Sequence, residues 1–103
     1  MALAIRLAGS QDAELALAID PAAAGDAHRT QWLRAAFAGV HGRIARLAIL
    51  DGEPAGFAIV GAFFSNPFLD LIVTAEAFRR RGVASALLDV VEAAHADQKL
   101  FVS

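Results

Sequence analysis

Three consecutive arginines followed by a glycine form the segment of this sequence with the clearest chemical meaning. Arg79, Arg80 and Arg81 precede Gly82, and an apolar helical pattern starts directly afterwards. The first N–H groups of a helix lack partners and its dipole is positive there, so arginines at this end favour a bound anion. Gly82 can adopt a positive φ and admit a ligand to the backbone, while Ala84 keeps the next contact small. The segment therefore predicts a phosphate-binding turn. In the purely structural alternative, Gly82 caps the helix and the arginines are solvated.

The elements around this turn must present it to a ligand. Residues 68–74 are apolar and rich in β-formers, which predicts a strand ending shortly before the arginines. Residues 99–103 alternate like the start of another strand. A strand, a helix and a strand in this order predict a parallel, right-handed crossover. The helix between them should have one apolar face, formed by Val83, Leu87, Val90, Val91 and Ala94.

The preceding part of the chain predicts two helices and an antiparallel hairpin. Residues 2–7 read as a strand, and Ser10 and Asp12 are candidate N-caps of a short helix that Asp20-Pro21 ends. A second helix is expected over residues 27–38, on the spacing of Trp32, Leu33, Phe37 and Val40.

The hairpin is predicted from two apolar stretches, residues 44–50 and 55–64, that flank an Asp-Gly turn. Both strands are apolar on both faces, so helices should cover the sheet on each side. Residues 65–67, Ser-Asn-Pro, predict the next turn.

Length and composition restrict the class of protein. The 103 residues predict a single domain, and the absence of cysteine excludes disulfides and thiolate metal sites. No metal is assigned to any residue. The formal charge of −2 gives no general attraction to nucleic acid. Neither a signal peptide nor an apolar run of about 20 residues occurs. We therefore expect a cytoplasmic protein that binds neither nucleic acid nor membranes.

The pattern Arg79-x-x-Gly82-x-Ala84, after a strand and opening an amphipathic helix, resembles the Arg/Gln-x-x-Gly-x-Gly/Ala signature of the GNAT superfamily of N-acetyltransferases. The order of elements along nearly the whole chain also resembles a GNAT domain. This resemblance implies an α/β fold, with a mixed sheet containing an antiparallel hairpin and the parallel crossover. It implies transfer of an acetyl group from acetyl-coenzyme A to an amine of a small molecule or a protein.

The resemblance also assigns roles to residues of this sequence. Asp70 is the candidate general base, with a structural carboxylate as the alternative, and a backbone N–H near Val73 would stabilise the oxyanion. His28, Arg29 and Trp32 lie on the helix that borders the acceptor cleft in such folds, although a core tryptophan with solvated neighbours is an equal alternative. The residues expected to bind coenzyme A are Leu71, Ile72, Val73, Arg79, Arg80, Arg81, Gly82, Val83, Ala84 and Ser85.

The sequence departs from the family in its C-terminal part. A complete GNAT domain continues with a further helix and two strands that usually carry a tyrosine general acid, whereas this sequence has no tyrosine. We therefore expect residues 1–103 to form one incomplete domain. Three alternatives to an active transferase stay open. The chain is a domain that binds acyl-coenzyme A without transfer, a truncated inactive form, or an interaction domain in which the arginines are only a solvated turn.

The expected terminal strand would lie at an open sheet edge. Unpaired backbone groups on an apolar edge promote pairing with another molecule. The side of the helix that carries Leu87 and Val91 should also lose its cover and expose apolar surface. The sequence therefore predicts either a homodimer or higher oligomer through the C-terminal edge, or a markedly unstable chain.

Overall fold

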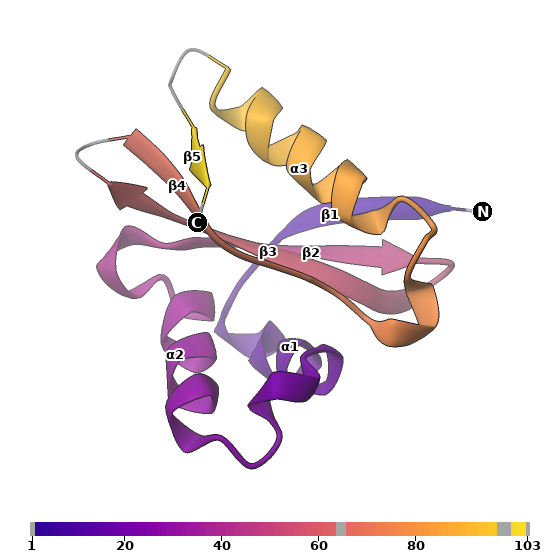
Figure 1. The fold of residues 1–103 in the computed structure, drawn as a ribbon, viewed down its shortest axis with the longest axis horizontal. Coiled ribbons are helices and arrows are strands. Elements are labelled where there is room, and N and C mark those ends of the chain that lie inside the picture. Colours follow the sequence, from indigo (N-terminus) through magenta and orange to yellow (C-terminus); the bar gives the residue numbers. More distant parts are fainter. Residues whose placement is uncertain (1, 64–65, 97–99, 103) are drawn as a thin grey trace.

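A computed structural model describes residues 2–63, 66–96 and 100–102, whose five strands form one sheet in the order β1-β2-β3-β4-β5 (Figure 1). The first four strands are antiparallel neighbours. β4 and β5 pair in parallel through Phe68 with Phe101 and Leu69 with Val102. The expected parallel strand is therefore present as this two-residue pairing. The strands are β1 Leu3–Ala8, β2 Ile44–Leu50, β3 Glu53–Phe63, β4 Asn66–Thr74 and β5 Phe101–Val102.

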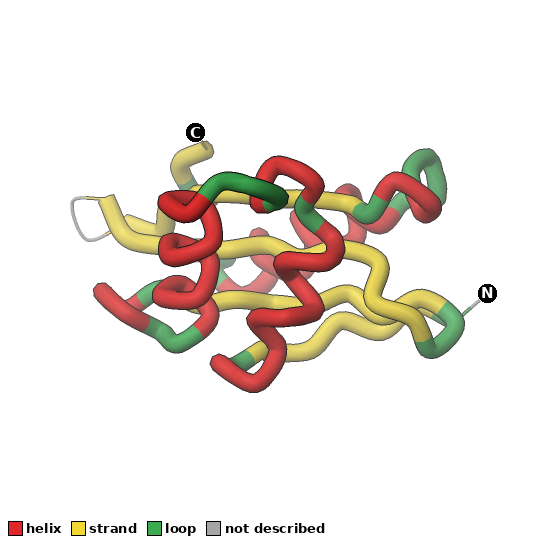
Figure 2. Tube along the Cα trace, turned by 90° about the horizontal axis from the view of Figure 1, so that it is seen from below, coloured by secondary structure: helices red, strands yellow, loops and turns green. Residues whose placement is uncertain are grey.

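Helices cover both faces of the sheet, as the apolar strands predict. α1 (Ala13–Ile19) and α2 (Ala27–Phe37) lie on one face, and α3 (Val83–Ala94) lies on the other (Figure 1). Figure 2 shows the helices crossing over the strands. Within the part of the chain that the structure describes, no helix has the length and apolar character needed to cross a membrane.

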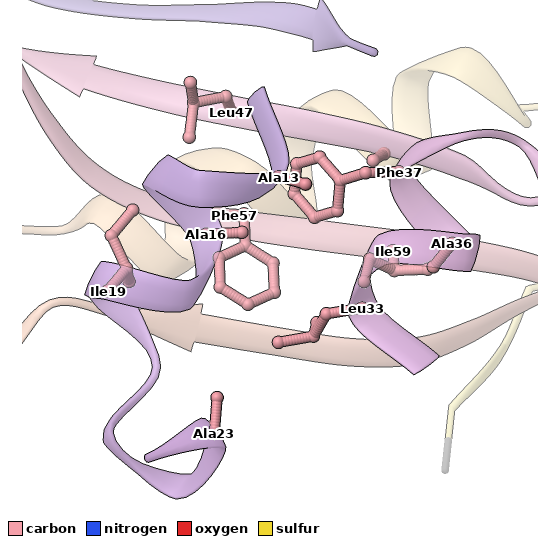
Figure 3. Close-up of a cluster of buried hydrophobic side chains, with 11 residues drawn as sticks. Ala13, Ala16, Ile19, Ala23, Leu33, Ala36, Phe37, Leu47, Phe57 and Ile59 are labelled. Carbon is pink, nitrogen blue, oxygen red and sulfur yellow. The ribbon is translucent and has the colours of Figure 1, made fainter. Parts of the chain in front are cut away.

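The core between the sheet and the first two helices is built on aromatic and aliphatic side chains (Figure 3). Phe37 of α2 meets Phe57 of β3 edge to face, with ring centroids 5.6 Å apart and planes at 71°. Leu33 and Ile59 are buried beside them. Fully burying side chains of this size stabilises a fold by about 1.5–3 kcal/mol each. This core fixes α2 on the sheet, which matters because α2 carries part of the site.

The core between the sheet and α3, on the other face, contradicts one expectation from the sequence. Leu87 and Val91 of α3 are 0% exposed, although the sequence predicted an uncovered face there. They point into the sheet together with Val83, so the sheet itself covers them. Val90, which was expected on the same apolar face, is 36% exposed. A 100° step per residue places it at the flank of the buried stripe.

The hairpin turn at Asp51-Gly52 is confirmed, both in its position and in its backbone conformation. Asp51 and Gly52 have φ of 51° and 83°, the two positive values that a type I′ turn requires. Because Glu53 already pairs with Leu50, β3 begins two residues earlier than expected.

The start of β4 was predicted incorrectly. Asn66 and Pro67 belong to the strand and pair with Phe63 and Ala62, rather than forming a turn. Proline is tolerated near the beginning of a strand, where a missing donor disturbs few ladder hydrogen bonds. Ser65, Lys99 and Ser103, which the sequence assigned to a turn and to the terminal strand, lie outside the described residues.

The start of α1 does not have the side-chain cap that the sequence predicted. Neither Ser10 nor Asp12 caps α1 through its side chain; residues Ser10–Asp12 form a 3-10 turn. The Asp12 carboxylate instead accepts hydrogen bonds from Arg6 and from Gly9 N–H. α2 is capped by Asp26, whose Oδ1 accepts from Arg29 N–H at 3.1 Å. This cap fixes the first turn of α2.

Candidate functional site

The site is organised by β4, whose outer edge is only partly paired. Within the described residues, β5 pairs with Phe68 and Leu69, and no strand pairs with the outer edge from Leu71 to Thr74. On its inner side β4 carries a bulge, because Leu69 pairs with Val60 and Leu71 with Ile59, leaving Asp70 as the extra residue. Bulges of this kind redirect side chains and are frequent beside active sites.

A cavity of about 470 Å³ lies between this edge and the start of α3. Three of its lining residues come from β4, and the others come from the arginine-glycine turn and the first turn of the helix. The lining residues are Ile72, Val73, Thr74, Arg79, Arg80, Gly82, Val83, Ala84 and Ser85. Most of the residues that the sequence assigned to coenzyme A are therefore brought together here.

The backbone of the turn has the form that an anion site needs. Gly82 precedes α3 with a φ of 79°, and Arg80 also has a positive φ, of 66°. Among the residues that the structure describes, no side chain caps α3, so the N–H groups of its first turn are available to a ligand. A β-carbon built on Gly82 would meet none of the described atoms within 4 Å. Ligand atoms could therefore approach the backbone at this point.

Two of the predicted residues lie outside this cavity. Leu71 lines a second cavity on the other side of β4, described below. Arg81 places its guanidinium carbon 5.8 Å from the centroid of the Phe78 ring, and it does not line the first cavity. A cation over an aromatic face is held there by the ring quadrupole.

The second cavity, of about 430 Å³, adjoins the same strand. Its wall combines the N-terminal part of α2 with the bulge of β4. The lining residues are Asp26, His28, Arg29, Trp32, Asp70 and Leu71. The structure thus joins His28, Arg29 and Trp32 to Asp70, although at least 38 positions separate them in the sequence. Neighbouring residues of one strand, Leu71 and Ile72, contribute to different cavities.

Asp70 is held by contacts that the sequence did not indicate. Arg43 donates from Nε to Oδ2 of Asp70 at 3.3 Å, and its guanidinium carbon lies 5.3 Å from the centroid of Trp32. The Asp70 carboxylate lies in space that is open only because Gly61 of β3 has no side chain. Asp70 and Arg43 are 27 positions apart, so no local pattern predicts their pairing.

Arg29 is oriented by a buried carboxylate. Its Nε donates to Oδ2 of Asp20 at 2.7 Å, and Asp20 is 3% exposed. Oδ1 of the same carboxylate accepts from Ala22 N–H at 3.1 Å. The interpretation of Arg29 as a merely solvated residue is therefore wrong, because its side chain forms a partly buried ion pair with Asp20, the residue that follows α1.

Comparison with known proteins agrees with this geometry. Residues 11–102 match the acetyltransferase (GNAT) family. The chain is similar to the solved structure of a ribosomal-protein-alanine N-acetyltransferase from Brucella melitensis biovar Abortus 2308, with 22% identity and a TM-score of 0.77. That alignment covers 99% of this chain and 79% of the other. A GNAT-family acetyltransferase from Bacillus cereus ATCC 10987 has 27% identity and a TM-score of 0.82, with 99% and 70% covered.

A third similar structure contains a ligand related to coenzyme A. AAC(6')-Iy, in complex with the bisubstrate analogue CoA-S-monomethyl-acetylneamine, has 18% identity and a TM-score of 0.72, with 100% of this chain and 80% of the other covered. Among curated protein sequences there is no significant match. None of these similarities supports the predicted homodimer. Because the family match spans most of the sequence, the chain belongs to the GNAT acetyltransferase family.

Proposed function

We propose that this chain transfers an acetyl group from acetyl-coenzyme A to the amine of a small molecule or a protein. The observation that carries the proposal is the division of β4 between two cavities. Ile72 to Thr74 line the cavity at the arginine-glycine turn, while Asp70 and Leu71 line the cavity beside α2. A donor in the first and an acceptor in the second would meet at the edge of β4.

The first cavity fits the diphosphate of coenzyme A. Arg79 and Arg80 supply positive charge, and the N–H groups at the start of α3 supply hydrogen-bond donors. The absence of a β-carbon at Gly82 lets phosphate oxygens reach these donors. The outer edge of β4 from Leu71 to Thr74, which pairs with no described strand, offers main-chain donors and acceptors to the amide groups of the pantetheine arm.

Acetyl-coenzyme A supplies the acetyl group as a thioester. A C–N bond to the acceptor forms and the C–S bond breaks, and the proton lost from the amine is balanced by the proton that the departing thiolate takes up. The chain has to bind the amine in its neutral form and stabilise the oxyanion. A main-chain N–H near Val73, a residue that lines the first cavity, is the candidate donor for the second task. Asp70, beside the acceptor cavity, is the candidate for receiving the proton, directly or through water.

Binding of acyl-coenzyme A without transfer is the second candidate. Two observations favour it: the sequence contains no tyrosine to act as general acid, and Asp70 is already paired with Arg43. The two candidates share the first cavity and differ only in turnover.

Calorimetry and a thiol-release assay separate these candidates. We expect coenzyme A and acetyl-coenzyme A to bind with similar affinity, and thiol release from acetyl-coenzyme A to depend on an added amine. Binding without amine-dependent release across a broad amine panel would support the second candidate. Failure of both coenzymes to bind the folded chain would refute both.

A further inference from the structure

Arg29 presents part of its guanidinium to the second cavity in a fixed orientation. Its Nε is engaged by Asp20, which is buried and is itself fixed by Ala22 N–H. The Arg29 side chain is 29% exposed and lines the cavity. Among the described residues, the hydrogen bond of the Arg29 guanidinium is made by Nε, and neither Nη atom donates one. The guanidinium therefore has donors left over after its structural ion pair is made.

These spare donors suit a carboxylate. A guanidinium is planar and always charged, and two of its N–H groups match the two oxygens of a carboxylate. Its orientation is already fixed by Asp20, so less side-chain entropy is lost when a ligand binds. A compact ammonium ligand would instead be repelled by this cation.

The acidic groups of the cavity are already engaged within the protein. Asp26 accepts the N–H of Arg29 as the cap of α2, and Asp70 pairs with Arg43. Trp32, which is partly buried against the core, supplies an apolar wall. The cavity therefore combines one cation with spare donors, one aromatic surface, and the strand edge at Leu71 where an amine would react.

We infer that the acceptor is an amino acid or a related small amino carboxylate, whose carboxylate binds the Nη groups of Arg29 while its amine lies at the β4 edge. The inference rests on the proposed transferase function and narrows it to a substrate class. The side chain of the acceptor lies along Trp32. The N-terminal residue of a protein has its α-carboxyl group in a peptide bond, so it lacks the charged group that would pair with Arg29 and is a poorer fit.

Trp32 provides a direct test, because it is the single tryptophan of the sequence and lines the cavity. Its fluorescence is titrated with leucine, phenylalanine and serine, and with the amide of each, in the presence and absence of coenzyme A. Each pair has the same amine and side chain and differs only in the carboxylate. We expect at least one amino acid to change the fluorescence in a saturable way, with the matching amide binding at least tenfold more weakly.

Variants assign this preference to Arg29. Arg29→Gln alone leaves Asp20 buried without its cation, so the double variant Arg29→Gln with Asp20→Asn is used beside it. The asparagine side chain can still accept from Ala22 N–H through its amide oxygen and needs no cation. Arg34→Gln is the matched control, because Arg34 lies on the same helix and pairs with Glu14 at the surface. We expect the carboxylate preference to vanish in the folded double variant and to persist in Arg34→Gln.

The outcomes separate this inference from the proposed function. Equal binding of each amino acid and its amide, no response to any of them, or a preference that survives the double variant would overturn the inference. If thiol release then still occurs with amines that lack a carboxylate, the transferase function stands. If coenzyme A does not bind, the proposed function fails, while the three amino acid and amide pairs still decide whether Arg29 holds a carboxylate.

Discussion

Oδ2 of Asp70 lies 2.5 Å from the point that a β-carbon on Gly61 would occupy. The absence of a side chain at Gly61 therefore allows the bulged residue of β4 to fold its carboxylate over β3. There it reaches Arg43, which in turn covers Trp32. One glycine thus sets the position of the carboxylate beside the proposed acceptor cavity.

Gly61→Ala is expected to displace Asp70 without unfolding the protein. The carboxylate is partly exposed and can rotate away from the new methyl group, at the cost of its bond to Arg43. We predict a loss of turnover of about tenfold, since small displacements of reacting groups have effects of this size or larger, with unchanged affinity for coenzyme A. Gly9→Ala, whose β-carbon meets only the flexible Gln11 side chain, is the control. Unaltered kinetics in a folded Gly61→Ala protein would show that the position of Asp70 is unimportant.

Asp70→Asn tests the proton-accepting role itself. If Asp70 receives the amine proton, the substitution lowers kcat by about 10²–10⁴-fold and alters the pH–rate profile. Affinity for coenzyme A should not change, because Asp70 does not line the first cavity. A profile of wild-type shape would assign Asp70 a structural role with Arg43.

Gly82→Asn should weaken coenzyme A binding at least tenfold while the fold persists. Asparagine adopts a positive φ more readily than other non-glycine residues, so the helix can still begin there, but its side chain would enter the open space of the cavity. Gly52→Asn is a matched control: its φ is 83°, its surroundings are equally open, and it lies in the hairpin turn. Calorimetry on both variants should show loss of affinity only for Gly82→Asn. Equal affinities would contradict the model of phosphates against this backbone.

Gly82→Val is a less specific version of this test. A β-branched residue is strained at a positive φ, so reduced binding in that variant would mix helix distortion with obstruction of the cavity.

The Arg6–Asp12 pair predicts a pH dependence of stability. Two guanidinium hydrogen bonds and the Gly9 N–H lower the pKa of Asp12 from 3.8 to about 2. Because the folded pKa is lower than the unfolded one, the stabilisation is fully present above about pH 4 and is lost as the pH falls towards 2. Asp12→Asn should cost about 1–2 kcal/mol near neutral pH, less than the full shift implies because Arg6 is half exposed.

Urea denaturation at several pH values measures this contribution. The unfolding free energies of wild type and Asp12→Asn should differ at pH 6 and converge towards pH 2. A difference that stays constant over this range would mean that the ion pair does not titrate with folding.

Much of the fold was predictable because its signals are local. The alternation of apolar residues marked the strands, and the 3.6-residue period marked α2 and α3. The Asp51-Gly52 turn follows from the need for two positive φ values, and the proposal of an anion site follows from arginines at an uncapped helix start. Each of these signals depends on residues that are close to one another in the sequence.

Other features were decided only by the tertiary structure, because they depend on how distant strands and helices are aligned. The bulge that isolates Asp70 arises from the register of β4 against β3, which no short segment encodes. The partners Arg43 and Asp70 come together across 27 positions, and Arg29 meets Asp20 only when α2 packs beside the end of α1. Packing also decided two further features. The sheet covers Leu87 and Val91 only once α3 packs on it, and β4 lines two cavities only because helices lie on both of its faces. The sequence thus determined the arginine-glycine turn that we propose binds an anion, whereas only the assembled sheet placed the second cavity beside it.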